Sequence, residues 1–304
     1  MIQTRVKALL QLMRPVPLVI WSVPTVTMGF VLQTHRAIKW PWALLIAVLG
    51  AMVLQGLVTH GLNDLYDWDS GTDKASPGII SGGSRVLANG LMTTTQVRNT
   101  VFGAVILYGG LTVLLSVLRG SGVWIWALLG LYGSVAYSLP PLRLSYRPYL
   151  GEWLALFPAM VSGVMLGGYA ADSALNPRLW WGALIYGIFC VASVMQHHLS
   201  DIDADWQANP QKLTTPCYWY RGLERSPLSL VALYEAMAMM AAMIGVIFVW
   251  RGFVLPLAVG SIAVVITKTT PFPSTPKTLT WRDLELKILS VGNVVGISLW
   301  ALWH

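Results

Sequence analysis

The chain has 304 residues, of which 55% are hydrophobic and 11% are charged, and its mean hydropathy is +0.61. Soluble domains usually carry about a quarter charged residues, so this composition excludes an ordinary soluble enzyme and indicates a membrane protein. The formal net charge of +7 needs no nucleic-acid partner, because basic residues flank membrane segments. The two cysteines, Cys190 and Cys217, are too few and too widely spaced to predict a disulfide framework or a zinc site.

Apolar stretches of about 20 residues, each long enough to cross roughly 30 Å of hydrocarbon, recur along the whole chain. The connections between them leave no room for a soluble domain of useful size, so we expect one all-α, polytopic membrane domain over residues 1–304. A basic amphipathic segment precedes the first stretch and lacks a small-residue cleavage site, so we expect it to be retained. The nine stretches are residues 16–34, 42–62, 99–118, 121–139, 150–171, 179–199, 227–250, 252–268 and 284–303.

The distribution of Lys and Arg predicts a cytoplasmic N-terminus and an external C-terminus. With the N-terminus inside, alternate connections place 15 of the 20 basic residues on the inner side, as the positive-inside rule favours. The basic residues left outside are Arg36, Lys39, Arg119, Arg178 and Arg251.

Acidic residues gather in two short clusters on the expected inner side, after the second and sixth apolar stretches. Within each cluster one pair is spaced three or four residues apart, Asp64 with Asp67 and Asp201 with Asp205, so both carboxylates of the pair project from one side of a helix end. We expect Asp69 and Asp203 to lie on the opposite side of each helix end. Like charges in that position repel unless a cation lies between them, and Mg²⁺ prefers carboxylate and phosphate oxygens. A solvated acidic connection is the simpler alternative for either cluster alone. The clusters are Asp64, Asp67, Asp69 and Asp73, and Asp201, Asp203 and Asp205.

Basic residues and a glycine-rich segment accompany these clusters. Lys74 and Lys212 each follow one cluster, and Arg85 and Arg143 lie on the same inner side. Together they would provide cationic donors for a diphosphate, although the inside-positive bias explains most of them individually. We expect residues 76–93 to form a re-entrant or capping segment over the polar site, with a plain connector as the alternative.

Four further polar residues lie in or beside apolar stretches. His197 and His198 precede the second cluster, but neighbouring helical residues point about 100° apart, so we expect only one to face the site. A hydrogen bond or acceptor contact is therefore favoured over a zinc site. Glu152 and Glu235 are costly inside a membrane, which makes them functional candidates; Glu235 has no motif beside it, and we expect a buried hydrogen bond there.

The two acidic motifs resemble those of the UbiA superfamily of intramembrane aromatic prenyltransferases. "NDLYD" at residues 63–67 is similar to its first motif, and "DIDAD" at residues 201–205 to its second. The resemblance implies nine transmembrane helices and Mg²⁺ that binds the diphosphate of an isoprenoid donor. It implies a catalytic role for Asp64, Asp67, Asp201, Asp205 and Tyr137, diphosphate contacts from Asn63, Lys74, Arg85, Arg143 and Lys212, and metal binding by Asn63, Asp64, Asp67, Asp73, Asp201 and Asp205.

Within the superfamily, three segments look like the 1,4-dihydroxy-2-naphthoate polyprenyltransferases of the menaquinone pathway. They are "NDLYDWDSGTDK", "GGSRVLANGLMT" and "YSLPPLRLSYRPYLGE". That branch implies transfer of a polyprenyl group to an aromatic acceptor with loss of CO₂, at the cytoplasmic face of a prokaryotic inner membrane and among its lipids. Glu152 and His198 are the acceptor-side candidates.

The second motif departs from that branch, because His197 and His198 stand where asparagines are usual and Ser200 replaces an arginine. This departure leaves the identity of the acceptor more open than the chemistry of the prenyl donor. The alternatives are another acceptor such as a hydroxybenzoate, a terpene cyclase that needs no acceptor, and a non-catalytic lipid-binding or transport protein.

Overall fold

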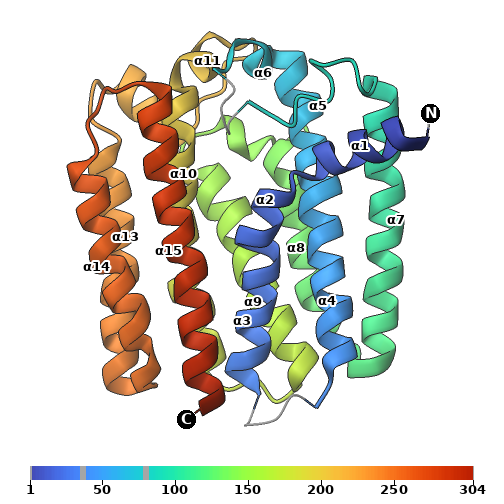
Figure 1. Ribbon diagram of the computed structural model, residues 1–304, viewed down its shortest axis with the longest axis vertical. Helices are drawn as coiled ribbons and strands as arrows, with labels where there is room; N and C mark the ends of the chain where they lie inside the picture. Colours follow the sequence, from blue (N-terminus) through green and yellow to red (C-terminus); the bar gives the residue numbers. More distant parts are fainter. Residues whose placement is uncertain (1, 35–38, 78–81, 304) are drawn as a thin grey trace.

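The computed structural model describes residues 2–34, 39–77 and 82–303, and every regular element within them is a helix (Figure 1). Arg36 of the expected outer connection and residues 78–81 of the glycine-rich segment lie outside the described residues. Eight helical segments are long and apolar enough to cross a membrane, which makes the chain an integral membrane protein, as the composition predicts. They are Pro15–Gln33, Pro41–Ser70, Thr94–Arg119, Gly151–Ala171, Pro177–Gln207, Leu228–Phe248, Arg251–Thr269 and Pro276–Trp303.

The remaining expected stretch, residues 121–139, forms the shorter helix α8, Val123–Ser138. Its 16 residues span about 24 Å, less than the hydrocarbon thickness. The two chain ends lie at opposite ends of the bundle, as an odd number of passes requires (Figure 1). The count of nine crossings nevertheless stays a prediction, because α8 is short of a full span.

Several passes consist of consecutive helical pieces with a turn of π-helix inside them. Helix α1 precedes the first pass and lies across the end of the bundle (Figure 1). The pieces are α1 (Ile2–Met13), α2 (Pro15–Pro17), η1 (Leu18–Ser22), α3 (Val23–Gln33), α4 (Pro41–Val53), η2 (Leu54–Thr59), α5 (His60–Ser70), α6 (Thr72–Ala75), α7 (Thr94–Arg119), α8 (Val123–Ser138), η3 (Leu144–Tyr146), η4 (Gly151–Leu156), α9 (Phe157–Ala171), α10 (Pro177–His198), η5 (Leu199–Asp201), α11 (Ile202–Gln207), α12 (Thr215–Cys217), η6 (Tyr218–Gly222), α13 (Leu228–Phe248), η7 (Arg251–Phe253), α14 (Val254–Thr269) and α15 (Pro276–Trp303).

Both acidic motifs belong to helical extensions of apolar passes. The second pass continues as helix to Ser70 and the sixth to Gln207, well beyond the expected stretches 42–62 and 179–199. At Gly71 the backbone takes a left-handed conformation with φ of 89°, which ends α5 before the short helix α6. The carboxylates of both motifs are therefore held on rigid helices at one end of the bundle, near α6 and α11 (Figure 1).

Small residues bring α3 and α9 close together at the centre of the bundle. A Cβ atom on Gly29 would overlap the backbone of α9, and one on Gly167 would overlap the backbone of α3. Close approach of small residues is a common way for helices to pack inside membranes. Large apolar side chains such as Phe102, Val117 and Phe248 point outward, as expected for a surface that lipid covers.

Candidate active site

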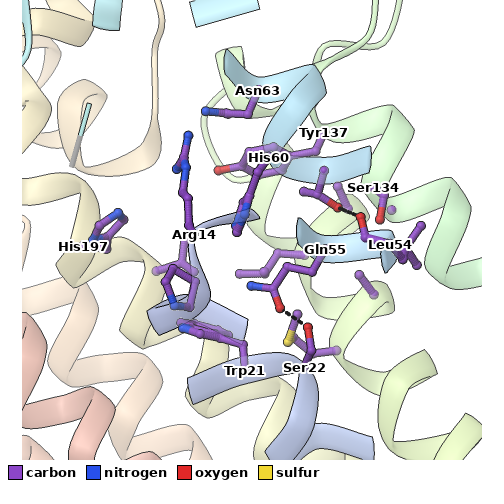
Figure 2. A pocket seen from close by; sticks show the side chains of 18 of the residues that line it. Arg14, Trp21, Ser22, Leu54, Gln55, His60, Asn63, Ser134, Tyr137 and His197 are labelled. Atoms are coloured by element: carbon purple, nitrogen blue, oxygen red, sulfur yellow. Dashed lines mark hydrogen bonds between the residues drawn. The ribbon is translucent and has the colours of Figure 1, made fainter. Parts of the chain in front are cut away.

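A cavity of about 250 Å³ lies inside the bundle and ends at the two acidic motifs. Its apolar wall includes Trp21, Met160 and Leu166, where Ser22 donates a hydrogen bond to Gln55 (Figure 2). Its polar wall is formed by Arg14, His60, Asn63, Asp67, Asp73, Tyr137, His197, His198, Asp201, Asp205, Lys212 and Lys287. The cavity thus joins a polar, charged end to an apolar chamber.

Asp64 of the first motif is buried and neutralised by a residue that sequence reasoning missed. Its carboxylate accepts hydrogen bonds from the guanidinium of Arg14 and from the hydroxyl and backbone N–H of Ser84, the last at 3.2 Å. Arg14 stands at the corner between α1 and α2 with φ of 51°, directly before Pro15. In the sequence, Arg14 is only one of the 15 basic residues expected on the inner side; the Arg-Pro pair before an apolar stretch is the available signal.

Asp67 is the point where the two motifs meet. It accepts hydrogen bonds from Asn63 at 2.9 Å, from the hydroxyl of Tyr146 at 2.8 Å and from the ammonium of Lys212 at 2.7 Å. The same ammonium lies 3.9 Å from Asp205, so one lysine connects carboxylates of α5 and α11. Burial lowers the pKa of Lys212, but the carboxylates of Asp67 and Asp205 raise it well above its usual value.

The carboxylates of the second motif are held by hydroxyl groups. Asp201 accepts a hydrogen bond from Ser76 at 2.6 Å, and Asp205 accepts one from Thr214 at 3.1 Å. The other oxygen of Asp205, Oδ1, is buried and receives no hydrogen bond within the described part of the chain. A buried carboxylate oxygen without a donor is costly, and a cation would satisfy it.

Asp73 lies under the glycine-rich loop, on the short helix α6. Burial, and then the carboxylates of the first motif, raise the pKa of Asp73 to about 8. Gly83 has φ of 77° and packs so closely that a Cβ atom would overlap the Asp73 carboxylate. Arg85 donates to the backbone carbonyl of Asp73 at 2.8 Å. The described part of this loop therefore covers the polar end of the cavity.

The side-chain oxygen atoms of Asn63, Asp64, Asp67, Asp73, Asp201 and Asp205 belong to carboxylates and one amide. This is the ligand set that Mg²⁺ prefers. The unsatisfied oxygen of Asp205 is consistent with that fit. Within residues 2–34, 39–77 and 82–303, no three His, Cys, Asp or Glu side chains converge closely enough to hold an ion by themselves. Arg14 and Lys212 instead contact carboxylate oxygens of the first motif.

With this geometry in place, comparison with known proteins identifies the family. The model of the UbiA prenyltransferase family matches residues 22–282. The chain belongs to the UbiA prenyltransferase family.

Solved structures share the UbiA fold over nearly the whole chain. A UbiA homologue from Archaeoglobus fulgidus bound to GPP and Mg²⁺ has a TM-score of 0.72 at 16% identity, covering 95% of this chain and 99% of that one. The apo structure of a UbiA homologue from Aeropyrum pernix K1 gives 0.61 at 15% identity, covering 92% and 94%. Identities this low establish a common fold.

A curated relative is a lycopene elongase/hydratase from Corynebacterium glutamicum. It is 21% identical over 177 residues, which are 57% of this chain. The match spans only 58% of that relative's length.

Four residues that the UbiA resemblance assigned to substrates do not line the cavity in the described part of the chain. Arg85 instead donates a hydrogen bond to the backbone carbonyl of Asp73, as described above. Lys74 is exposed, with its ammonium 4.6 Å from the centre of the Trp68 ring. Arg143 lies over two tyrosine rings, the nearer centre at 4.1 Å. Glu152 is buried and accepts a hydrogen bond from Thr215 at 2.8 Å, which ties η4 to α12.

Tyr137 and His198 do line the cavity of this UbiA protein, with the tyrosine hydroxyl 3.4 Å from Nε2 of His198. Our expectation that only one of the neighbouring histidines faces the site is wrong, because His197 lines the cavity as well. The centres of the two rings lie 6.1 Å apart, and both rings border the cavity. Figure 2 shows His197 on the opposite side of Arg14 from Tyr137.

Three acidic residues outside the UbiA metal set behave as the sequence predicts. Asp69 is exposed, and Asp203 is exposed and pairs with Arg221. Glu235 is buried and accepts a hydrogen bond from Thr267 at 2.8 Å. The helical spacing therefore separated the buried carboxylates of each motif from the solvated ones.

Proposed function

We propose that this UbiA family member transfers a prenyl group from a prenyl diphosphate to an acceptor held in the cavity. The observation that carries the proposal is the contact of one buried lysine, Lys212, with Asp67 at 2.7 Å and Asp205 at 3.9 Å. It brings two acidic motifs from distant parts of the chain to the mouth of an apolar cavity. An apolar chamber that ends in carboxylates and cations suits a molecule with an apolar chain and a charged head.

In this proposal the aspartates of both motifs hold Mg²⁺, which the solved homologue contains together with GPP. When bound, Mg²⁺ neutralises charge on the diphosphate leaving group. Lys212 and Arg14 add N–H donors at the same end of the cavity. Tyr137 lines the cavity, where its ring would stabilise positive charge on the prenyl carbon. The residues proposed to hold the ion are Asn63, Asp64, Asp67, Asp73, Asp201 and Asp205.

The chain itself needs no nucleophile, because an electron-rich carbon of the acceptor attacks the allylic carbon as the diphosphate leaves. The apolar wall keeps water from the reactive carbon. Our first candidate acceptor is 1,4-dihydroxy-2-naphthoate, with loss of CO₂, in quinone biosynthesis. Its support is the likeness of three sequence segments to that branch. The active site would then lie at the cytoplasmic face of a prokaryotic inner membrane, the face predicted from Lys and Arg.

A second candidate is an isoprenoid hydrocarbon acceptor. Two observations favour it, namely the similarity to a lycopene elongase/hydratase and the replacement of the branch's asparagines and arginine by His197, His198 and Ser200. An acceptor without a carboxylate does not need the lost arginine.

The test uses purified protein in lipid nanodiscs with Mg²⁺, geranyl diphosphate or a longer prenyl diphosphate, and one acceptor at a time. The acceptors are 1,4-dihydroxy-2-naphthoate, 4-hydroxybenzoate and lycopene. We expect diphosphate release that a chelator abolishes and a prenylated product from one acceptor. Absence of diphosphate release with every donor and acceptor would overturn the proposal, and release with a cyclic hydrocarbon as product would replace it by a cyclase.

A further inference from the structure

Three charged or titratable side chains meet on the cavity wall about one helical turn from Asp201 of the second acidic motif. His197 comes from α10, and Asp283 and Lys287 come from one face of α15. Nδ1 of His197 lies 2.9 Å from Oδ2 of Asp283 and 3.1 Å from the ammonium of Lys287, which also contacts Asp283. His197 and Lys287 both line the cavity. The proposed diphosphate site does not use this cluster, although His197 stands at one of the asparagine positions of the second motif.

The cluster is costly in a membrane helix, which argues for a function. Asp283 is only 2% exposed and Lys287 only 7% exposed; Lys287 lies in the expected apolar stretch 284–303, and Asp283 directly precedes it in the same helix α15. Ionisable residues at such positions usually mark substrate or proton pathways. The other oxygen of Asp283, Oδ1, is buried and receives no hydrogen bond within the described residues. Simple helix packing does not require such a group.

The contacts favour one tautomer of His197. Nδ1 and the Asp283 carboxylate would both present lone pairs at 2.9 Å, so a proton must lie between them. The ammonium of Lys287 also lies 3.1 Å from Nδ1, but it already donates to Asp283, and the shorter contact with the charged carboxylate decides the tautomer. Nδ1 therefore donates to Asp283. This leaves the lone pair on Nε2. In the described part of the chain Nε2 makes no hydrogen bond, and the His197 side chain is 26% exposed, on the cavity wall.

We propose that His197 binds a hydroxyl group of the acceptor and takes its proton through Nε2, with Asp283 as the positioning residue. This rests on the proposed prenyl transfer and narrows the acceptor to a hydroxylated aromatic. As the O–H proton moves to Nε2, the oxygen electron pair forms a C=O bond. The ring electron pair bonds to the prenyl carbon, and the C–O pair leaves with the diphosphate. Loss of CO₂, or transfer of the ring proton to the released diphosphate, returns a pair to the ring, and the oxygen recovers its proton from His197.

The test compares a variant enzyme with a modified acceptor. His197→Gln keeps a hydrogen-bond donor for Asp283 but removes the basic nitrogen. The acceptors are 1,4-dihydroxy-2-naphthoate, 4-hydroxybenzoate and their methyl ethers, which have no hydroxyl proton. Diphosphate release and prenylated product are both measured with geranyl diphosphate and Mg²⁺. Asp203→Asn, an exposed substitution, is the control.

We expect His197→Gln to lower transfer to the hydroxylated acceptor by about 10²-fold, a usual contribution of a general base. On the methyl ether the variant should be no slower than the wild type, because that acceptor has no proton to give. Equal losses on both acceptors, or no loss on either, would overturn the assignment. If the enzyme prenylated lycopene and none of the hydroxylated acceptors, the assignment would also be overturned, since lycopene has no hydroxyl group. The proposed prenyl transfer itself would stand.

A double variant covers the case in which His197→Gln does not fold. Asp283→Asn with Lys287→Met removes the charged anchor of His197, leaving at most a neutral amide acceptor, and keeps the buried charge balanced. We expect the rate of prenyl transfer to fall about tenfold with the hydroxylated acceptor and not at all with its methyl ether. Loss on both would indicate a structural role and overturn the positioning assignment. If the wild type itself releases no diphosphate, the proposed function fails, whatever the variants do.

Discussion

The paired carboxylates of both acidic motifs are buried but are held in different ways. In the first motif, Asp64 contacts Arg14 and Asp67 contacts Lys212, so each carboxylate has a cation within hydrogen-bond distance. In the second, Asp201 and Asp205 accept hydrogen bonds from hydroxyl groups, and the Lys212 ammonium lies farther from Asp205, at 3.9 Å. Ion pairs neutralise charge, whereas hydroxyl donors only orient it.

This difference indicates how the site accommodates a divalent ion. The second motif keeps a carboxylate oxygen without a hydrogen-bond donor, Oδ1 of Asp205, which has the Lys212 ammonium only at 3.9 Å. In the proposed site it would coordinate the ion without losing a hydrogen bond, whereas the first motif would exchange its contacts with Arg14 and Lys212 for metal and phosphate. We therefore propose that the first motif is the stabilising half in the absence of substrate and that the second is the half prepared for the ion.

The largest expected effects come from removing one carboxylate from each motif. Asp67→Ala and Asp201→Ala should each lower the rate of diphosphate release by at least about 10²-fold at saturating Mg²⁺, because each removes a group that stabilises the leaving group. Both variants should stay folded and membrane-inserted by size-exclusion chromatography. Asp67→Ala should also lower the melting temperature more, because it leaves Lys212 with one carboxylate partner. Equal melting temperatures would contradict the contrast between the motifs.

Lys212→Met is the next most severe change, because it acts on both motifs together. Removing one partner of a buried ion pair costs about 3–5 kcal/mol, so the melting temperature should fall clearly. Added Mg²⁺ should recover part of this loss in the variant, since the ion replaces the missing charge between Asp67 and Asp205. Thermal melts with and without Mg²⁺ measure this. A variant whose stability does not respond to Mg²⁺ would show that the carboxylates are not shared by an ion.

The fold was largely predictable because a membrane imposes one simple rule. Every backbone polar group must be satisfied inside the segment, so apolar stretches become helices. The ends of the passes were not predictable from hydropathy. The polar residues of "NDLYD" and "DIDAD" lowered the local hydropathy, yet they continue the helices to Ser70 and Gln207. Tertiary contacts with neighbouring loops stabilise these extensions.

The site was predictable where the residues form a local pattern. Helical spacing separated Asp67 from Asp69, and the structure buries the first and exposes the second. Contacts between distant segments could not be predicted, such as Arg14 with Asp64 or His197 with Asp283. They depend on how helices pack side by side, which spacing along one helix does not encode.

Arg14→Met should have a smaller effect, with an unusual direction. Arg14 contacts the Asp64 carboxylate and therefore competes with Mg²⁺ for it. The Arg14 side chain is 19% exposed. A partly exposed ion pair contributes about 1 kcal/mol, so its removal should lower the Mg²⁺ concentration for half-maximal activity by about fivefold. Titration of activity with Mg²⁺ at fixed donor concentration measures this. A higher Mg²⁺ requirement would show that Arg14 contributes to ion or diphosphate binding more than it competes for Asp64.

The smallest expected effects are those of Asp69→Ala and Asp203→Ala, the solvated neighbours of the buried carboxylates. Asp69 is exposed, and the pair of Asp203 with Arg221 is exposed on both sides, where ion pairs contribute little. Each variant should keep its rate of diphosphate release within about twofold of the wild type. Because these residues alternate with Asp67, Asp201 and Asp205 along the same helical ends, they are matched controls for charge and position. A loss comparable to that of Asp67→Ala would mean that the helical face, and with it the division between coordinating and solvated carboxylates, is assigned wrongly.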